Sequence, residues 1–320
     1  KCVALRGPNA SDMLAQLEML TKLQLQPSPS PPILRYLLAP RSTPSAPLLA
    51  LCHKGGTTTH LAPLLETALE RFRLNEEQAR VLRRVAAWVD SPEESTTPPT
   101  LLVHGVFGAG KSHLLVSVLW YLQRALLGVT RQGRPVKVLL AALTNVAVDN
   151  VLEGLIACAG EGEDPGVLRV GALRRIAPAV LPHSTHGKLA IDDEAATKRE
   201  LQRELQSSTS GHERESLQQA IAQIDSGRMR ARAQAIGKYR VVGATCAATG
   251  LPCLAGVPFD IVLLDECSQL TEPASMLPLM RVQCSRLLAV GDPMQLPPTL
   301  HNRTAPGASP SANGSSNATD

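Results

Sequence analysis

The stretch that decides the fold is Leu101-Leu-Val-His-Gly-Val-Phe-Gly-Ala-Gly-Lys-Ser112. Residues 101–104 form an apolar run that predicts a strand, and residues 105–112 fit the pattern Gly-x-x-x-x-Gly-Lys-Ser/Thr. The glycines let the backbone curl until its N–H groups face a polyphosphate, and the helix that follows turns its positive N-terminal end to the same group. A chance glycine-rich turn is the alternative, but the position between a strand and a helix favours a nucleotide-binding loop.

This loop predicts ATP and Mg²⁺ as ligands. Lys111 would bridge the β- and γ-phosphates, and Ser112 would coordinate Mg²⁺. The residues expected to contact the nucleotide here are Gly105, Val106, Phe107, Gly108, Ala109, Gly110, Lys111, Ser112 and His113.

Outward from the loop, short apolar runs alternate with helical patterns. Helices are expected at 61–72, 76–89, 110–127 and 145–158, and strands at 101–104, 137–142, 167–170, 240–243, 261–264 and 286–290. Unbroken apolar strands separated by helices are typical of a parallel sheet that is covered on both faces. The fold class is therefore α/β.

Other segments depart from this pattern. A leucine stripe predicts a helix at 12–25, and a proline-rich linker follows at 27–47, with a polar connector at 91–99. Residues 188–236 are charged and free of proline, which predicts two antiparallel helices inserted as a stalk. The expected domains are 1–73 (accessory helices and linker), 74–300 (the ATPase domain with the stalk) and 301–320 (a disordered tail).

Composition narrows the function only slightly. The net charge is +4, which suits an anionic partner without demonstrating one. The seven cysteines include no Cys-x-x-Cys pair, which argues against a disulfide framework or a zinc ribbon. No apolar run approaches the roughly 20 residues that span a bilayer, so no membrane partner is expected.

Two more strand ends carry polar residues suited to phosphate chemistry. Asp265 and Glu266 follow an apolar run; the first would hold Mg²⁺ and the second would act as a general base toward water. A solvated strand end is the alternative. Gln295, in the polar turn after residues 286–290, would orient water or sense the γ-phosphate, although a rigid surface loop explains the turn equally well.

Hydroxyl and amide side chains close two further strands. Thr144, Asn145 and Thr245 stand at carboxyl ends of strands, where open α/β sheets bind their ligands. They would hold the phosphates of a nucleic-acid strand. Capping of the following helix by Thr144 or Asn145 is an equally good local explanation.

Taken together, these motifs resemble superfamily 1 helicases. They include Gln78, the loop at 105–112, Thr144-Asn-Val-Ala-Val-Asp149, Asp265-Glu-Cys-Ser-Gln269 and Gly291-Asp-Pro-Met-Gln-Leu-Pro-Pro298, in the family's order over residues 74–299. The branch is the one that includes the nonsense-decay helicase and senataxin, and within it the GRF-type zinc-finger DNA helicases. The resemblance implies the first RecA-like lobe of a P-loop motor.

The resemblance also implies roles. Gln78 would read the adenine edge; Lys111, Asp265, Glu266 and Gln295 would be catalytic; Thr144, Asn145 and Thr245 would touch a single strand. Such motors step 5′ to 3′, work in the nucleus or the cytoplasm, and need a second RecA-like lobe in cis that carries an arginine finger. DNA is favoured over RNA as the track, and the nucleus as the location.

The sequence departs from the family pattern at three points. Leu143 replaces a usual proline, Met294 replaces a frequent lysine, and the resemblance stops near residue 299, so the second lobe is expected to be missing. A non-catalytic product that binds nucleotide, nucleic acid or partners without unwinding is therefore the alternative function. A P-loop kinase or other NTPase is a third, which the strings Asp-Glu-Cys-Ser-Gln and Gln-Leu-Pro-Pro disfavour.

Overall fold

A computed structural model describes residues 33, 37, 52–53, 61–90, 98–131, 133–160, 162–188, 192–208, 211–280 and 284–298. The helix expected at 12–25, the tail at 301–320, and most of the linker at 27–47 and of the connector at 91–99 lie outside these residues. Within the expected linker, Ile33 and Leu37 are helical, which corrects the prediction of an irregular segment at these two positions.

A six-stranded sheet forms the centre of the fold. Its strands are β2 (Thr100–His104), β5 (Val138–Ala142), β6 (Val167–Val170), β7 (Val241–Thr245), β8 (Ile261–Asp265) and β9 (Arg286–Gly291), in the spatial order β2-β9-β8-β5-β7-β6. All five neighbouring pairs are parallel. The predicted α/β class with a parallel sheet is confirmed.

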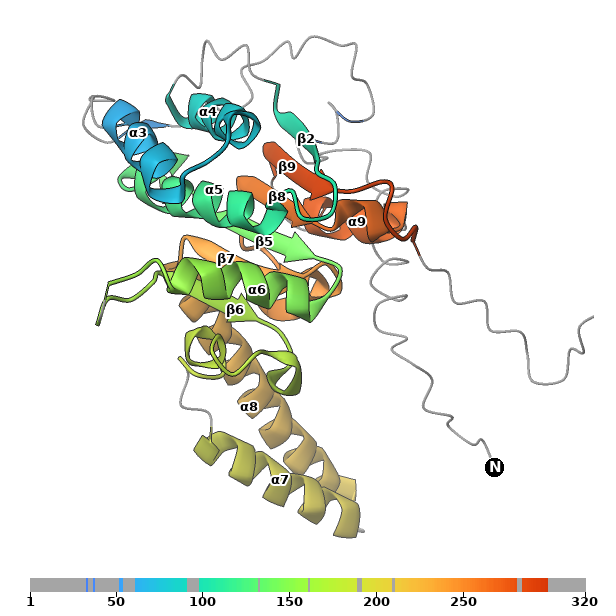
Figure 1. Ribbon diagram of the computed structural model, residues 1–320. Helices are drawn as coiled ribbons and strands as arrows, with labels where there is room; N and C mark the ends of the chain where they lie inside the picture. The colour runs from blue at the N-terminus through green and yellow to red at the C-terminus, as the bar shows by residue number, and fades with distance from the viewer. Residues whose placement is uncertain are drawn as a thin grey trace, which may run out of the picture.

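Helices cover both faces of this sheet (Figure 1). On one face lie α3 (Leu61–Phe72), α4 (Glu76–Asp90), α5 (Lys111–Ala125) and α6 (Asn145–Ile156); on the other lie α9 (Glu272–Met280) and the end of α8 (Gly211–Lys238). Within β5, Leu140 packs toward the first group and Leu139 toward the second. Because side chains alternate along a strand, an all-apolar strand fills both cores.

The start of α4 is fixed by a reciprocal cap. The N–H of Gln78 donates to Oδ1 of Asn75 at 2.9 Å, and the N–H of Asn75 donates to Oε1 of Gln78 at 3.2 Å. This pair of bonds is a capping box. The preceding helix α3 packs on α5, with the rings of Phe72 and Trp120 edge to face at 5.7 Å. The domain boundary expected at residue 73 stays a prediction. Helix α3, which precedes it, and helix α5, which follows it, share one hydrophobic core.

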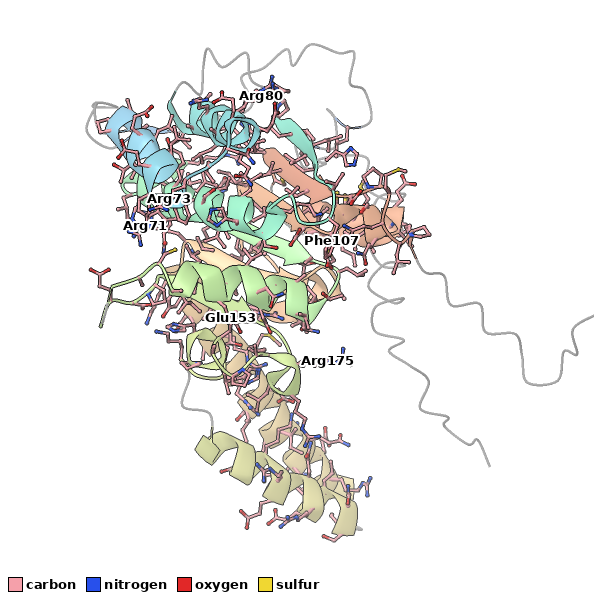
Figure 2. All side chains as sticks on the ribbon, viewed as in Figure 1. Arg71, Arg73, Arg80, Phe107, Glu153 and Arg175 are labelled. Carbon is pink, nitrogen blue, oxygen red and sulfur yellow. The ribbon has the colours of Figure 1, made fainter. Side chains whose placement is uncertain are left out.

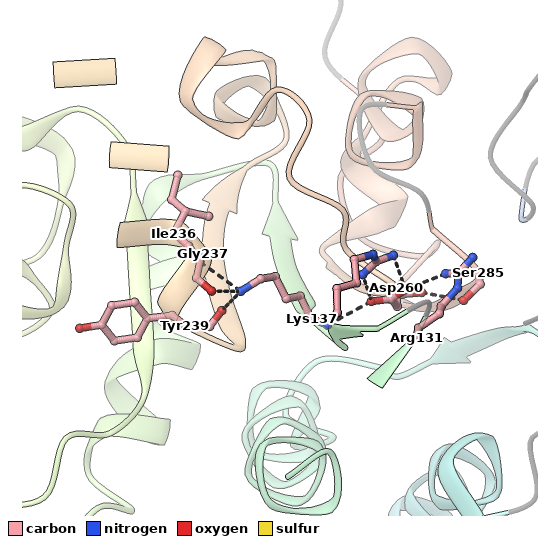
Figure 3. Close-up of polar contacts among 8 residues, drawn as sticks. Arg131, Lys137, Ile236, Gly237, Tyr239, Asp260 and Ser285 are labelled. Atoms are coloured by element: carbon pink, nitrogen blue, oxygen red, sulfur yellow. Dashed lines mark hydrogen bonds and ion pairs between the residues drawn. The ribbon is translucent and has the colours of Figure 1, made fainter. Parts of the chain in front are cut away.

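The stalk consists of α7 (Asp192–Ser207) and α8, inserted between β6 and β7. The two helices pack on one another, and Lys198 pairs with Asp225. At the base of the stalk, Nζ of Lys137 donates to the carbonyls of Ile236, Gly237 and Tyr239 at 3.2, 2.7 and 2.6 Å (Figure 3). This lysine therefore anchors the C-terminal end of α8 to the amino edge of the sheet.

Some elements went unrecognised in the sequence. A small antiparallel sheet joins β1 (Cys52–His53), β3 (Val129–Arg131) and β4 (Arg134–Pro135). Five short 3₁₀ turns are also present: η1 (Leu173–Arg175), η2 (Leu181–His183), η3 (Ala247–Gly250), η4 (Pro252–Leu254) and η5 (Cys267–Gln269). Strands of two or three residues are too short to show a period, so sequence alone could not find them.

A buried ion cluster joins β3 and β4 to Asp260, the residue that precedes β8. Asp260 accepts from Arg131 at 2.6 Å and from both terminal nitrogens of Arg134 at 2.9 and 3.0 Å. The backbone N–H of Lys137 also donates to Asp260, at 3.1 Å (Figure 3). The cluster satisfies the buried carboxylate and fixes the amino edge of the sheet.

Three general findings concern the described residues only. The five cysteines whose side chains are described are free thiols. No helix in this part of the chain is long and apolar enough to cross a membrane. Within the same ranges, no group of three or more histidine, cysteine, aspartate or glutamate side chains is arranged to hold a metal ion.

Candidate nucleotide-binding site

The residues predicted to bind nucleotide meet at the carboxyl edge of the sheet. His104 at the end of β2 lies opposite Gly291 at the end of β9, and Asp265 at the end of β8 lies opposite Ala142. The N–H of Gly105 donates to the carbonyl of Gly291 at 3.0 Å. Asp265 and the loop at 105–112 therefore share one rim of the sheet.

The P-loop itself adopts the conformation that its glycines allow. Gly108 and Gly110 have φ values of 77° and 74°, in the left-handed region that favours glycine. Helix α5 begins at Lys111 without a side-chain cap. The N–H groups of its first turn have no intrahelical partner, so the positive end of the helix is left for an anion.

Lys111 folds back over its own loop. Its Nζ donates to the carbonyl oxygens of Gly105 at 2.7 Å and Val106 at 3.1 Å. A Cβ at Gly105 would lie 2.8 Å from Cγ of Lys111, so the lysine passes where only a glycine leaves room. The ammonium is half-buried beside the loop and can exchange these carbonyls for phosphate oxygens.

Gln78 reaches the loop from α4. Its Nε2 donates to the carbonyl of Ala109 at 3.1 Å, while its Oε1 accepts from Asn75. One amide N–H thus remains for a nucleobase. A cleft of about 760 Å³ opens here between α4, β2 and the loop, lined by Gln78, Val81, Leu102, His104 and Lys111 among others. This volume lies in the range of nucleotide-sized pockets.

Not every predicted contact faces this cleft. The ring of His113 pairs its Nε2 with the carbonyl of Phe72 at 2.8 Å, which turns it toward α3. Phe107 is 90% exposed and extends outward from the tip of the loop (Figure 2). Val106 is 59% exposed and does line the cleft. Because the side chains of Val106 and Phe107 carry no polar group, the polar contacts of this part of the loop come from its backbone.

Asp265 is buried at the end of β8. Burial raises the pKa of its carboxyl from 3.8 to about 6; the charge of Glu266 acts in the same direction, while the N–H of Glu266 and the charge of Lys111 act against it. That N–H donates to Oδ1 of Asp265 at 2.9 Å. A cation placed beside this buried carboxyl would stabilise its ionised form, which is the form that binds a metal ion.

Glu266 has a strained backbone. Its φ is 52°, in the left-handed region, and only one other non-glycine among the described residues, Arg73, has a positive φ. Its Oε2 is buried and has no hydrogen-bond partner in the described part of the chain. A buried carboxylate oxygen without a partner needs a donor, and a water molecule would supply one.

Gln295 is held by Asp292. Its Nε2 donates to Oδ2 of Asp292 at 2.9 Å, and His104 lies 3.5 Å from Oδ1 of the same carboxylate. Burial alone would raise the pKa of Asp292, but hydrogen bonds from the Met294 N–H, Gln295 and His104 outweigh burial and lower it. The predicted sensor is thus linked to the strand that precedes the P-loop.

The loops after β8 and β9 also pack against each other. The N–H of Asp292 donates to Oγ of Ser268 at 3.1 Å. A Cβ at Gly291 would lie 2.9 Å from Sγ of Cys267. The glycine of the Gly-Asp-Pro-Met-Gln string is therefore required by this close approach, which holds two motifs in one unit.

The three residues predicted to touch nucleic acid lie farther along the same rim. Oγ1 of Thr144 accepts from the N–H of Ala147 at 3.1 Å, and Oγ1 of Thr245 accepts from the N–H of Ala248 at 3.2 Å. Thr144 is therefore an N-cap, as the local explanation held. Its exposed hydroxyl keeps a hydrogen to donate. Asn145 bonds to Arg169.

Sequence reasoning missed three residues that support this site. His104 and Asp292 orient Gln295, and Arg169 orients Asn145. His104 and Arg169 lie 24 or more residues from the side chains that they contact, and no local pattern reports such contacts. A signal existed only for Asp292, which follows Gly291 directly in the motif.

The residues present fit a nucleoside triphosphate with a divalent cation. The open positive end of α5 and the Lys111 ammonium suit phosphates, and the unpartnered Oε2 of Glu266 suits an ordered water. Ser112 and Asp265 are the residues that would hold Mg²⁺. Two protein ligands suffice, because Mg²⁺ keeps waters and phosphate oxygens as its other ligands.

Comparison with known proteins agrees with this geometry. Residues 73–221 and 190–303 match the model of the AAA domain family. Over 267 aligned residues the chain is 41% identical to the "5'-3' DNA helicase ZGRF1" of Mus musculus, covering 79% of this chain and 14% of that protein.

Two further relatives are more distant. Identity is 27% to the "DNA polymerase alpha-associated DNA helicase A" of Schizosaccharomyces pombe, over 63% of this chain and 30% of that protein. Identity is 26% to the "Probable helicase senataxin" of Homo sapiens, over 74% of this chain and 11% of that protein. The chain thus spans less than a third of each relative's length. It belongs to the AAA domain family, within the superfamily 1 helicases.

Proposed function

We propose that this chain is the ATP-binding first lobe of a 5′-to-3′ superfamily 1 DNA helicase, which couples ATP hydrolysis to movement along a single strand and to unwinding. The observation that carries the proposal is the meeting of the P-loop, Asp265, Glu266 and Gln295 at one rim of a parallel sheet. ATP and Mg²⁺ are the proposed cofactors, with Gln78 beside the base.

Each residue of this rim has a proposed task. The first-turn N–H groups of α5 and the Lys111 ammonium hold and neutralise the phosphates. Ser112 and Asp265 hold the cation, which when bound supplies charge neutralisation at the phosphates. Glu266 accepts a proton from the attacking water, and Gln295 orients that water or senses loss of the γ-phosphate.

The nucleic-acid track is proposed at the ends of β5 and β7. Thr144, Asn145 and Thr245 offer hydroxyl and amide groups, which suit phosphate and sugar contacts rather than base reading. The names of the mouse and fission yeast relatives support DNA over RNA. We also propose action in DNA repair and a nuclear location for the whole protein, which imaging of the tagged full-length protein would test.

Full activity is proposed to require a second RecA-like lobe in cis that brings an arginine finger. Such a finger contributes a factor of about 10³ to 10⁵ in rate. A polypeptide limited to these 320 residues is therefore expected to bind ATP and to hydrolyse it slowly.

The decisive test is nucleotide and oligonucleotide binding by the wild type and Lys111→Ala. We expect a fluorescent ATP analogue to bind the wild type with Mg²⁺ and to bind the variant at least about tenfold more weakly, because charge-assisted hydrogen bonds are lost. Labelled single-stranded DNA should bind both proteins, more weakly as salt is added. Equal analogue binding by both proteins would refute the proposal, and brisk hydrolysis without a second lobe would refute its two-lobe part.

A further inference from the structure

A buried arginine stands behind one of the proposed nucleic-acid contacts. Arg169 of β6 is fully buried, and its guanidinium serves three acceptors. Nε donates to Oδ1 of Asp149 at 2.6 Å, Nη1 donates to the carbonyl of Val170 at 2.6 Å, and Nη2 donates to Oδ1 of Asn145 at 2.8 Å. The second oxygen of Asp149 accepts from the N–H of Ala177 at 2.8 Å.

This arrangement is enclosed and specific. Asp149 is 3% exposed, so the ion pair with Arg169 lies away from solvent. A Cβ at Gly171 would lie 2.8 Å from Nη1 of Arg169, so the chain after β6 closes over the guanidinium. A paired and enclosed arginine cannot itself reach a ligand, and its effect must pass through the side chains that it holds.

The chemistry of the guanidinium decides which way the Asn145 amide faces. Arginine carries only donors, so the atom of Asn145 turned toward it must be the acceptor Oδ1. The amide nitrogen, with its two hydrogens, is then left to face away from Arg169. Asn145 is the first residue of α6 and is only half-buried, so these donors lie at the surface of the carboxyl rim.

We infer that Arg169 is a positioning residue that fixes Asn145 as a hydrogen-bond donor toward the anionic backbone of a single strand. The inference rests on the proposed function and deepens it. A freely rotating amide would present its oxygen to a phosphate as readily as its nitrogen, and the oxygen would repel it. With Arg169 in place, only the attractive orientation is populated.

The exchange of one atom tests this idea. Asn145→Asp keeps an oxygen toward Arg169. The guanidinium of Arg169 then lies between the carboxylates of residues 145 and 149. An acidic residue is also favourable in the first turn of a helix. The variant should therefore fold, with a melting temperature close to that of the wild type, but it presents an oxygen where a donor is needed.

Asn150→Asp is the matched control. Asn150 is exposed on the same helix, so its replacement adds the same charge close by without touching the Arg169 network. The measurement is the Kd for fluorescein-labelled oligo(dT) of 20 nucleotides at about 0.1 M salt. We expect Asn145→Asp to weaken binding at least about tenfold and Asn150→Asp by about twofold or less. Both should bind the fluorescent ATP analogue as the wild type does.

A double-mutant cycle tests whether Arg169 acts through Asn145. Arg169→Lys keeps the charge beside Asp149 but lacks the planar fork that reaches three acceptors. We expect Arg169→Lys and Asn145→Ala each to weaken oligo(dT) binding, and their combination to weaken it no further than one of them.

The outcomes separate cleanly. Additive effects in the cycle, or Asn145→Asp binding DNA as tightly as Asn150→Asp, would overturn the inference while leaving the proposed function intact. If Arg169→Lys fails to fold, the comparison of the two aspartate variants still decides. A wild type that binds no oligonucleotide would overturn both the proposed function and the inference.

Discussion

A Cβ added at Gly110 would lie 2.7 Å from Nε2 of Gln78, closer than a side-chain carbon can approach. The P-loop and α4 therefore meet at a point where a side chain on residue 110 would displace the amide of Gln78. Because Gln78 also bonds to the carbonyl of Ala109, the same contact sets the floor of the proposed base pocket.

Gly110→Ala is expected to weaken nucleotide binding about tenfold or more, because Gln78 must move and the left-handed φ becomes strained. Gly128→Ala is the control, since Gly128 has a φ of 77° with nothing within 4 Å of an added Cβ. Both variants should lose about 1 kcal/mol of stability from φ strain. Titration with the fluorescent ATP analogue separates them; equal loss of binding in both would contradict the role of Gln78.

Asp265→Asn is expected to stabilise the nucleotide-free protein at neutral pH. The raised pKa, about 6, means that folding favours the protonated carboxyl, so the contribution of this group to stability is lost as pH rises from 3.8 through 6. Asparagine mimics the neutral form. Its advantage over the wild type should be on the order of 1–3 kcal/mol at pH 7.5 and should shrink toward pH 4.

Chemical denaturation of both proteins at several pH values measures this advantage. The same variant should lose the Mg²⁺ dependence of nucleotide binding, because one of the two proposed cation ligands is gone. A stability difference that stays constant with pH would show that burial of Asp265 is not its cause.

Two substitutions of Glu266 separate the effect of its backbone strain from the proposed role of its carboxylate. Glu266→Gly should remove the strain of a φ of 52° and stabilise the fold by up to about 1 kcal/mol, while Glu266→Gln keeps that strain. Both variants should bind ATP. Both should abolish single-turnover hydrolysis in the proposed two-lobe motor, because the proposed base is removed. Glu272→Gln, an exposed carboxylate at the start of α9, is the control that should hydrolyse normally.

Lys137→Met should loosen the base of the stalk. Its removal leaves three carbonyls at the end of α8 without their donor, so amide hydrogen exchange should rise near residues 236–239. Lys238→Met, at an exposed neighbour, should not change it. Burial, followed by Arg240 and Arg134, lowers the pKa of Lys137 to about 8 from 10.5.

The lowered pKa has a consequence for pH dependence. As pH rises, the Lys137 ammonium loses its proton at a lower pH in the folded protein than in the unfolded chain. The contribution of Lys137 to the free energy of unfolding therefore rises between pH 8 and 10.5. Lys137→Met should lack that rise, which denaturation at pH 7.5 and 9.5 measures. An identical rise in both proteins would exclude Lys137 as its source.

The strands and main helices could be predicted from sequence because their signals are local. The apolar runs of β5 and β8 and the capping residues Asn75 and Thr144 need only neighbouring positions to be recognised. The order of the strands has no such signal. It follows from crossovers and long-range packing, as do the contacts of His104 with Asp292 and of Arg169 with Asn145.

Two kinds of feature lay beyond sequence patterns for a physical reason. Helix α9 contains Pro278, which argues against a helix on local grounds, yet the helix packs its Leu279 into the second core. The lowered pKa of Lys137 depends on burial and on arginines from other elements, which only the folded chain brings together.

The stalk joins the domain next to the start of β7, since the carbonyl of Arg240 accepts from the N–H of Val138 at 2.8 Å at the amino rim. The residues proposed for ATP hydrolysis lie on the opposite, carboxyl rim. A fluorophore or tether could therefore be attached at Ser208, between the two stalk helices, for single-molecule measurements of lobe rotation. The label would lie on the side of the sheet away from the proposed phosphate site.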